Sequence, residues 1–328
     1  MLSLTPLLLG SLTITWTTKT YPTIRPLSIA PAPTGRMFVA STEDNLVRII
    51  DPTAGTVKQF AGHAVPARAV AWKPDGKVIL SGDERAKIYF WDVASGKNTK
   101  IIINHIRPIN KLSWNASGSM FVSTGDDDVA NVFTSTGKKA ATFAGKGANV
   151  YGTAFSPKSE LIACGVLDMG GGVRAFATNG ASKGSGKYVN PATNEAHGAF
   201  DMAWSPDGTK VVTAGRDQRV IIWNAKTWTR LAVLSGHEDY VRKVAYSPNG
   251  KIIASSSSDR TVRLWDAATF LPIATIPDQS AIGSPITFTA DGKYLITTGI
   301  DDALQVRTLT PPQGASSAPT TKKKKGRG

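Results

Sequence analysis

The hydrophobic residues of this chain fall in short alternating runs rather than in long amphipathic stretches. Runs such as 252–256 and 261–265 are apolar or alternating over about five residues and are bounded by turn residues, which is typical of β-strands. Pro-Asp-Gly at 206–208 and Pro-Asn-Gly at 248–250 predict tight turns, because proline presets φ and glycine tolerates positive φ. No stretch keeps a 3.6-residue period. The pattern therefore predicts an all-β protein without a long helix.

This group of runs recurs about every 42 residues, and three landmarks follow it in phase. A large residue, small only at the first site, ends the first run of each unit: Ala30, Trp72, Trp114, Phe155, Trp204, Tyr246 and Phe288. The third run ends at Ile50, Trp91, Phe133, Phe176, Trp223, Trp265 and Arg307. Six residues before these lie Asp44, Arg85, Asp127, Gly170, Asp217, Asp259 and Asp301. A fixed period of this length indicates a repeat architecture, here with seven units.

The last unit has apolar runs at 285–289, 294–298 and 304–309 and lacks a fourth. The run 11–17 precedes the first unit and alternates like a strand, so we expect it to complete the last unit and close a ring. An open ring would leave unpaired strand edges. A strand needed by the fold, and the lack of a positive n-region, argue against a signal peptide in residues 1–20. The domain prediction is an apolar extension at 1–10, the repeats at 11–310, and a disordered linker with a basic tail at 311–328.

The repeated residues resemble the WD40 family. Gly236-His237, the Ser-Pro-Asp-Gly turn at 205–208 and the closing Trp265-Asp266 carry the resemblance, which extends over about residues 24–308. It implies a seven-bladed β-propeller with four strands per blade. The units ending at Trp91, Trp223 and Trp265 fit the family pattern best, whereas those ending at Phe176 and Arg307 are degenerate.

Ser, His and Asp recur in each good unit, which raises the alternative of a hydrolase. All four histidines, His63, His105, His197 and His237, precede the first run of a unit, so they serve the repeat. The resemblance implies that this histidine bonds the aspartate of the turn between the second and third strands, and that a Ser or Thr and the tryptophan extend the network. The residues assigned to this structural network are His63, His237, Asp217, Asp259, Trp91, Trp223 and Trp265. Units with Arg85 or Gly170 at the aspartate position would lack it.

The chain is basic, with a net charge of +14. The tail holds Lys322, Lys323, Lys324, Lys325 and Arg327; without them 33 basic and 24 acidic residues remain, so the ring itself is basic. In a WD40-type blade, lysines of the turns between first and second and between third and fourth strands share one face, the bottom. They are Lys73, Lys77, Lys97, Lys100, Lys138, Lys139, Lys158, Lys183, Lys187, Lys210, Lys226, Lys251 and Lys293. This face and the tail are expected to bind an anionic partner such as RNA, or the lysines serve only solubility.

The opposite, top face offers candidates for binding a protein. Arg and Tyr are enriched at binding hot spots, and the turns of this face hold Arg107, Arg216, Tyr240, Arg242 and Arg260. The alternative is that these arginines pair with Asp83, Asp239 and Asp302. The fourth unit is about seven residues longer than its neighbours, with the excess at 179–199; this is either a functional loop or a tolerated insertion.

The leading hypothesis is a non-catalytic interaction scaffold that holds a protein partner on its top face within a larger assembly. The alternative is a ribonucleoprotein- or ribosome-associated subunit that binds RNA through its lysine-rich face and tail. A propeller enzyme is the third hypothesis, and the first strands, with mostly apolar and small residues, do not favour it. No metal-ligand spacing is present, the single cysteine (Cys164) lies in an apolar run, and no apolar run could span a membrane. We expect no cofactor and an intracellular, cytoplasmic location, with the nucleus or an organelle as open alternatives.

Overall fold

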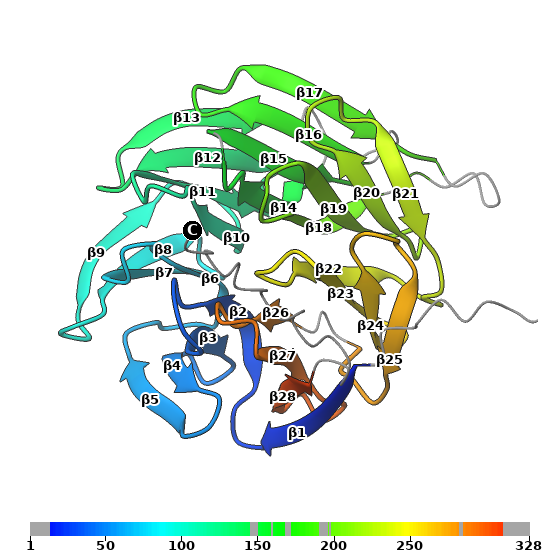
Figure 1. Ribbon diagram of the computed structural model, residues 1–328. Helices are drawn as coiled ribbons and strands as arrows, with labels where there is room; N and C mark the ends of the chain where they lie inside the picture. Colours follow the sequence, from blue (N-terminus) through cyan, green and yellow to red (C-terminus); the bar gives the residue numbers. More distant parts are fainter. Residues whose placement is uncertain are drawn as a thin grey trace, which may run out of the picture.

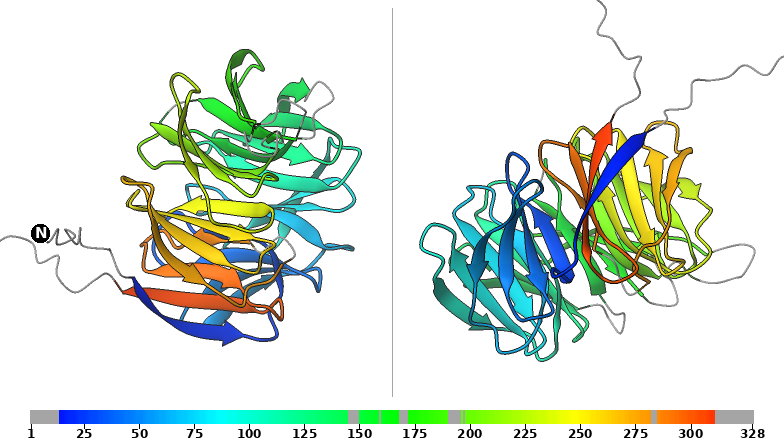
Figure 2. Two further views of the ribbon diagram at one scale, coloured as in Figure 1. Left: turned by 90° about the vertical axis from the view of Figure 1, so that its right-hand side faces the viewer. Right: turned by 90° about the horizontal axis from the view of Figure 1, so that it is seen from below.

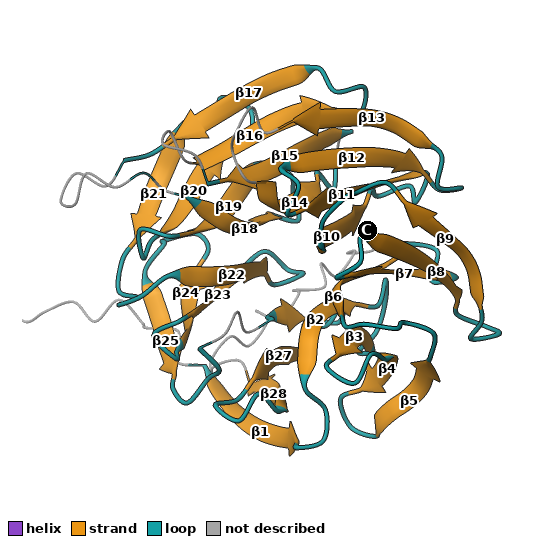
Figure 3. Cartoon of the chain, turned by 180° about the vertical axis from the view of Figure 1, so that it is seen from behind, coloured by secondary structure: helices purple, strands orange, loops and turns teal. Residues whose placement is uncertain are grey.

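The computed structural model describes residues 14–310 except 145–149, 159, 168–171, 190–195, 197 and 282–284. In this part of the chain there are 28 strands and no helix. The strands form seven four-stranded antiparallel sheets arranged as blades around a central axis (Figure 1, Figure 3). The predicted all-β, seven-bladed propeller is confirmed.

Each blade uses its strands in order from the axis outward, and the blades are numbered 1 to 7 along the chain. The innermost strands are β2 (Pro26–Pro31), β6 (Ala67–Trp72), β10 (Ile109–Trp114), β14 (Val150–Phe155), β18 (Ala199–Trp204), β22 (Val241–Tyr246) and β26 (Thr287–Phe288). The second strands are β3 (Phe38–Thr42), β7 (Val78–Asp83), β11 (Met120–Gly125), β15 (Leu161–Val166), β19 (Lys210–Gly215), β23 (Ile252–Ser257) and β27 (Tyr294–Thr298). The third strands are β4 (Val47–Asp51), β8 (Lys87–Asp92), β12 (Val129–Thr134), β16 (Gly172–Ala177), β20 (Val220–Asn224), β24 (Val262–Asp266) and β28 (Leu304–Thr310). The outermost strands are β5 (Gly55–Phe60), β9 (Asn98–Ile103), β13 (Lys139–Ala144), β17 (Ser182–Lys187), β21 (Arg230–Leu234), β25 (Pro272–Ile276) and, for blade 7, β1 (Thr15–Tyr21).

The ends of the strands define two faces of the ring. The top face carries the connections that enter the innermost strands and the turns between second and third strands; the bottom face carries the other turns. The bottom turns have the predicted chemistry: in blade 5, Gly208 has φ of +71°, and the Asp207 carboxylate accepts hydrogen bonds from the Thr209 amide (3.0 Å) and the Ser205 hydroxyl (2.6 Å). The same proline-containing turn starts the second strand of blade 6 after Gly250 (φ +70°).

Blade 7 is completed by the N-terminal strand, as predicted. β1 pairs with β28 over seven residues, from Thr15 opposite Thr310 to Tyr21 opposite Leu304. The strand lies four residues later than the expected run 11–17, of which residues 11–13 are outside the described part. Because Thr15 and Thr310 are partners, the beginning of β1 and the end of β28 lie side by side at the bottom face (Figure 2).

The core is built between blades rather than within them. Seven clusters of buried side chains each join two neighbouring blades, including one between blades 7 and 1 that packs Ile296 and Leu304 against Phe38 and Ile50. Cys164 lies in the cluster between blades 3 and 4, where burial raises the pKa of its thiol to about 12, so it behaves as a core residue.

The long fourth unit contains the outermost strand of blade 4 within the expected excess at 179–199. β17 is rich in glycine because blade 5 packs closely against it: a Cβ on Gly184 would lie 2.2 Å from the Trp228 ring, and one on Gly186 would lie 2.5 Å from the Trp223 ring. The described residues include no helix of the length and apolarity that crossing a bilayer would require.

Removing residues 1–21 should destabilise the ring, because β28 would lose its partner and the buried Ile14 and half-buried Trp16 would leave the cluster between blades 6 and 7. We expect the free energy of unfolding to fall by about 3–5 kcal/mol, measured by denaturant titration. A synthetic peptide of residues 13–25 added in trans should restore stability, and a scrambled peptide should not. An unchanged unfolding midpoint after truncation would show that closure does not depend on β1.

Candidate functional site

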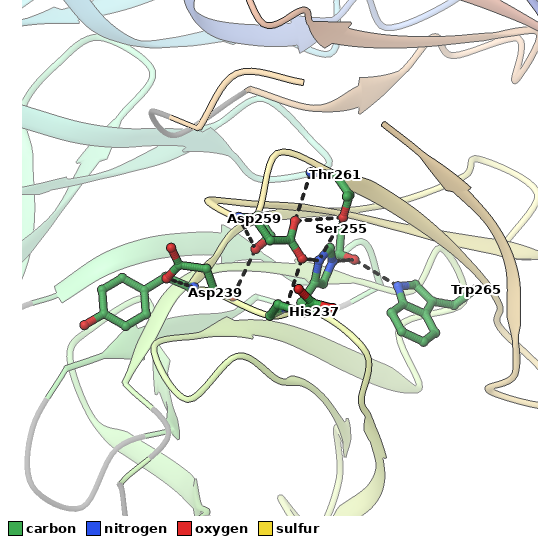
Figure 4. Close-up of polar contacts among 9 residues, drawn as sticks. His237, Asp239, Ser255, Asp259, Thr261 and Trp265 are labelled. Carbon is green, nitrogen blue, oxygen red and sulfur yellow. Dashed lines mark hydrogen bonds and ion pairs between the residues drawn. The ribbon is translucent and has the colours of Figure 1, made fainter. Parts of the chain in front are cut away.

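A chain of buried hydrogen bonds joins the top-face turns of blade 6 to its third strand (Figure 4). His237 Nδ1 lies 2.7 Å from Asp259 and its Nε2 lies 2.8 Å from Ser255 Oγ, which also accepts a bond from Trp265 Nε1 (2.9 Å). Burial would raise the pKa of Asp259, but hydrogen bonds from His237 and Thr261 outweigh it and hold the pKa well below its usual range.

Blade 2 has the same series of hydrogen bonds, with its aspartate at a different position. His63 Nε2 lies 2.6 Å from Ser81 Oγ, and Trp91 Nε1 donates to the same oxygen at 2.7 Å. The position equivalent to Asp259 is Arg85, which predicts that this blade lacks the network. The structure differs, because Asp83, two residues earlier, lies 3.4 Å from His63 Nδ1.

Other blades keep some of these hydrogen bonds, in part with different side chains. In blade 3, His105 lies between Asp127 (2.8 Å) and Ser123 (2.7 Å), and burial lowers the pKa of the histidine despite the nearby aspartate. Blade 5 retains the bond from Trp223 Nε1 to Thr213 (2.9 Å), and Asp217 is buried in its turn. His197 and Gly170 lie outside the described residues.

Blade 7, which looks degenerate in sequence, has substitutes for the histidine, serine and tryptophan of this hydrogen-bond series. Gln279 Oε1 accepts from Thr297 Oγ1 at 2.8 Å, and Arg307, at the tryptophan position, donates to Thr297 Oγ1. Burial lowers the pKa of Arg307 to about 10.

The Asp–His–Ser order in blades 2, 3 and 6 matches that of a hydrolytic triad, but the groups are closed off. The side chains of His63, His105 and His237 are at most 1% exposed, and Ser81, Ser123 and Ser255 are fully buried. A nucleophile must reach its substrate, so this arrangement stabilises the blades. The described residues also contain no cluster of three metal-ligating side chains.

The top end of the central channel contains a feature that periodicity does not reveal. The innermost strands of blades 1 to 6 each have a β-bulge at their second residue, where the pairing with the next strand shifts. A bulge redirects a side chain out of the alternating pattern. The bulged residues line one cavity of about 540 Å³: Leu27, Arg68, Asn110, Tyr151, Phe200 and Arg242.

Charged side chains lie around and below this cavity, which corrects the expectation of apolar and small first strands. Lys111 of blade 3 reaches the buried Asp201 of blade 5 (2.9 Å), and Lys243 of blade 6 lines the cavity. Burial would raise the pKa of Asp201, but Lys111 and Lys243 outweigh it and hold the pKa below its usual value. Burial lowers the pKa of Lys243, with Asp201 opposing. Blade 4 contributes Gly152 here, where a Cβ would lie 2.7 Å from the Asp201 Cα.

Three of the five top-face candidates contact one another beside this cavity. The Arg216 guanidinium lies 5.9 Å from the Tyr240 ring centre, and that of Arg242 lies 5.2 Å from the same ring. Arg242 is also 4.8 Å from the ring of Phe200, which meets Tyr151 edge to face at 6.1 Å. We call Tyr151, Phe200, Arg216, Tyr240 and Arg242 the aromatic–arginine cluster. Sequence reasoning missed Tyr151 and Phe200; each is the second residue of an innermost strand, and the bulge there directs it to the channel.

Arg107 and Arg260 are exposed on the same face and do not join this cluster. The expected alternative partners of the arginines are engaged elsewhere: Asp239 accepts from the Tyr240 amide (2.6 Å) and Asp302 from Ser280, while Asp83 bonds His63. Within the described ranges no ion pair joins these aspartates to the arginines.

Some lysines at the bottom face already bind other parts of the protein, so not all of them are available to an anionic partner. Lysines of outermost strands donate to backbone carbonyls in the turn of the next blade: Lys19 to Thr53 (2.6 Å), Lys58 to Val93 and Ala94 (both 2.6 Å), and Lys100 to Thr136 (2.6 Å). Lys100 was among the candidates for anion binding. The tail residues Lys322–Lys325 and Arg327 lie outside the described part.

Comparison with known proteins assigns the class. The family model "WD domain, G-beta repeat" matches residues 55–92 and 228–266, which contain the two complete Asp–His–Ser–Trp chains of blades 2 and 6. The two matched segments are WD40 repeats, and they lie in a seven-bladed β-propeller. A second model, "Eukaryotic translation initiation factor eIF2A", matches residues 80–230.

Curated relatives are similar over part of their length. The chain is 24% identical over 251 residues to "Ribosome biogenesis protein WDR12 homolog" of Chlamydomonas reinhardtii, covering 64% of this chain and 56% of that protein. It is 26% identical over 194 residues to "Actin-interacting protein 1-2" of Arabidopsis thaliana (56% and 30%) and 26% identical over 161 residues to "Eukaryotic translation initiation factor 3 subunit I" of Culex quinquefasciatus (45% and 48%). This chain therefore spans about a third to just over half of these relatives.

Substituting Ser255→Ala should destabilise blade 6, because both His237 Nε2 and Trp265 Nε1 would lose their buried partner. We expect the free energy of unfolding to fall by about 2–4 kcal/mol in urea titrations. Ser117→Ala, in an exposed turn, is the control and should change it by less than about 0.5 kcal/mol. Equal effects of the two changes would contradict a stabilising role for the buried chain.

Proposed function

We propose that this protein is a non-catalytic, intracellular scaffold that holds a protein partner on its top face within a larger assembly. The aromatic–arginine cluster carries this proposal. It places two arginines and three aromatic rings from blades 4, 5 and 6 around the mouth of the channel, and these residue types dominate the energetics of protein interfaces.

The geometry supports binding rather than chemistry at this face. The rings and guanidinium groups hold one another in place before a partner arrives, which reduces the side-chain entropy lost on binding. The serine and histidine side chains that could act in catalysis are used inside the blades. Arg107 and the exposed Ile106 (89% exposed) of blade 3 extend the proposed surface away from the cluster, and Arg260 does so on blade 6.

A second candidate function is that of a ribonucleoprotein- or ribosome-associated subunit. The match to the initiation factor model over residues 80–230 and the relative named for ribosome biogenesis favour it. In this proposal the tail residues and the bottom lysines contact RNA phosphates. Lys226 and Lys251 are exposed there.

Substituting Arg216→Ala and Tyr240→Ala together should release the partner. The tagged protein would be isolated from its native source and its copurifying proteins quantified by mass spectrometry. We expect at least a 30-fold loss of the main partner, since each hot-spot side chain contributes about 2 kcal/mol or more. Lys251→Ala, at the bottom face, is the matched control. Full retention of the partner by the folded double variant would refute binding at the cluster.

Removing residues 315–328 should reduce the salt dependence of RNA binding if the second candidate is correct. The segment carries five positive charges, so the slope of log affinity against log salt should become shallower by about 3.5 for single-stranded RNA. Filter binding of an oligouridylate at several salt concentrations measures this slope, with Lys226→Gln and Lys251→Gln in the full chain for comparison. An identical slope for truncated and full-length protein would rule out the tail as an RNA contact.

A further inference from the structure

The cavity at the top of the channel is lined by basic side chains, two of which have no ion-pair partner among the described residues. Three basic residues line it, Arg68, Arg242 and Lys243, and Lys111 follows the lining residue Asn110. Among the described residues, Arg68 pairs with Asp126 (3.4 Å) and Lys111 with Asp201 (2.9 Å). Within the described part of the chain, neither Arg242 nor Lys243 has an ion-pair partner. Their positive charges face the same space from adjacent parts of strand β22.

Arg242 is fixed in a position that leaves its binding end available. Its Nε donates to Ser258 Oγ (2.9 Å), and its guanidinium carbon lies 4.8 Å from the Phe200 ring centre and 5.2 Å from the Tyr240 ring centre. Within the described part of the chain its terminal nitrogens have no acceptor. A guanidinium held in this way presents a planar pair of donors, which matches the geometry of a carboxylate.

Lys243 is the more unusual residue: it is half-buried, and burial lowers the pKa of its ammonium group, so its charged form needs compensation. The negative charge of Asp201 favours the charged form of Lys243, but Asp201 already pairs with Lys111. Arg68, Arg242 and Lys111 all disfavour its charged form. An anion in the cavity would supply the compensation that the surrounding side chains do not.

The number of charges and the size of the cavity limit the ligand. Arg242 and Lys243 contribute two positive charges and the lining carboxylate of Glu84 offsets one of them, so the remaining charge balances a single carboxylate and not a polyphosphate. A volume of about 540 Å³ accommodates one or two side chains. Leu27, Tyr151 and Phe200 supply apolar wall, which suits the methylene groups of an acidic side chain more than a hydrated phosphate.

We propose that the cavity is an acidic anchor site: an aspartate or glutamate side chain of an extended peptide segment inserts between Arg242 and Lys243 while the flanking residues pack on Tyr151 and Phe200. The inference rests on the proposed function, because the peptide belongs to the protein partner of the top face. It adds the chemistry of recognition, in which the partner is selected by a carboxylate at the ring axis.

The test uses the full-length protein and a display library of random 12-residue peptides. The best binder is synthesised in two forms, with its acidic residue as Glu and as Gln, and both are titrated by fluorescence anisotropy. We expect enrichment of Asp or Glu at one position and at least tenfold weaker binding of the Gln form. The Glu and Gln pair is measured on the unmodified protein, so this readout does not depend on the folding of any variant.

Variants then locate the anchor. Arg242→Gln and Lys243→Gln should each bind the Glu peptide at least tenfold more weakly and should distinguish Glu from Gln by less than about twofold. Lys251→Gln, an exposed bottom-face change, should leave both affinities unaltered. Thermal unfolding of each variant checks that the ring is intact.

Four outcomes would overturn the proposal. Selected peptides without a preferred acidic residue, or peptides that bind Arg242→Gln and Lys243→Gln as tightly as the unmodified protein, would show that the cavity is not an anion site. A library that yields no binder would exclude a peptide anchor of this length. Competition by an oligouridylate that requires both cations would assign the cavity to RNA. In each case the capture of the native partner, with its dependence on Arg216 and Tyr240, separately decides the proposed function.

Discussion

Closure of the ring is the constraint on which the rest of this structure depends. Every hydrophobic cluster lies between two blades, so no sheet buries its apolar face until its neighbour is in place. The chain meets this requirement at its last blade by pairing β1 with β28 across almost the whole sequence. The closed ring also fixes the innermost strands around one axis, and only this convergence brings side chains from six blades to a common cavity.

The fold could be predicted because the residues that set strand ends and turns recur at a fixed spacing in the sequence. The residues that end the first and third runs, such as Trp72 and Trp91, mark strand ends in the structure as the sequence suggests. The missing fourth strand of the last unit and the spare N-terminal run likewise identified the closure, although β1 begins later than expected. These features depend on spacing and turn residues, which are visible in a single chain.

The candidate site was only partly predictable. Arg216, Tyr240 and Arg242 could be placed on the top face from their turns, but their mutual contacts depend on how blades 5 and 6 approach. The channel cavity was missed for a specific reason. Side chains of a regular strand alternate between the two faces of the sheet, and a bulge interrupts this alternation. Arg68 and Phe200, which lie at bulges, therefore point in directions that a regular strand would not give them. Substitutes such as Asp83 for Arg85, or Gln279 and Arg307 in blade 7, preserve hydrogen bonds without preserving residue type.

The lysines that bridge blades at the bottom face give this region a second role besides its charge. Lys19, Lys58 and Lys100 each use their ammonium group to hold carbonyl oxygens of the adjoining blade. Acetylation of Lys58 would convert a donor of several hydrogen bonds into a neutral amide and remove the tie between blades 1 and 2. Chemical modification of this surface would therefore weaken the contacts between neighbouring blades. Labelling of these lysines would report on how tightly the blades are joined as well as on what binds to this face.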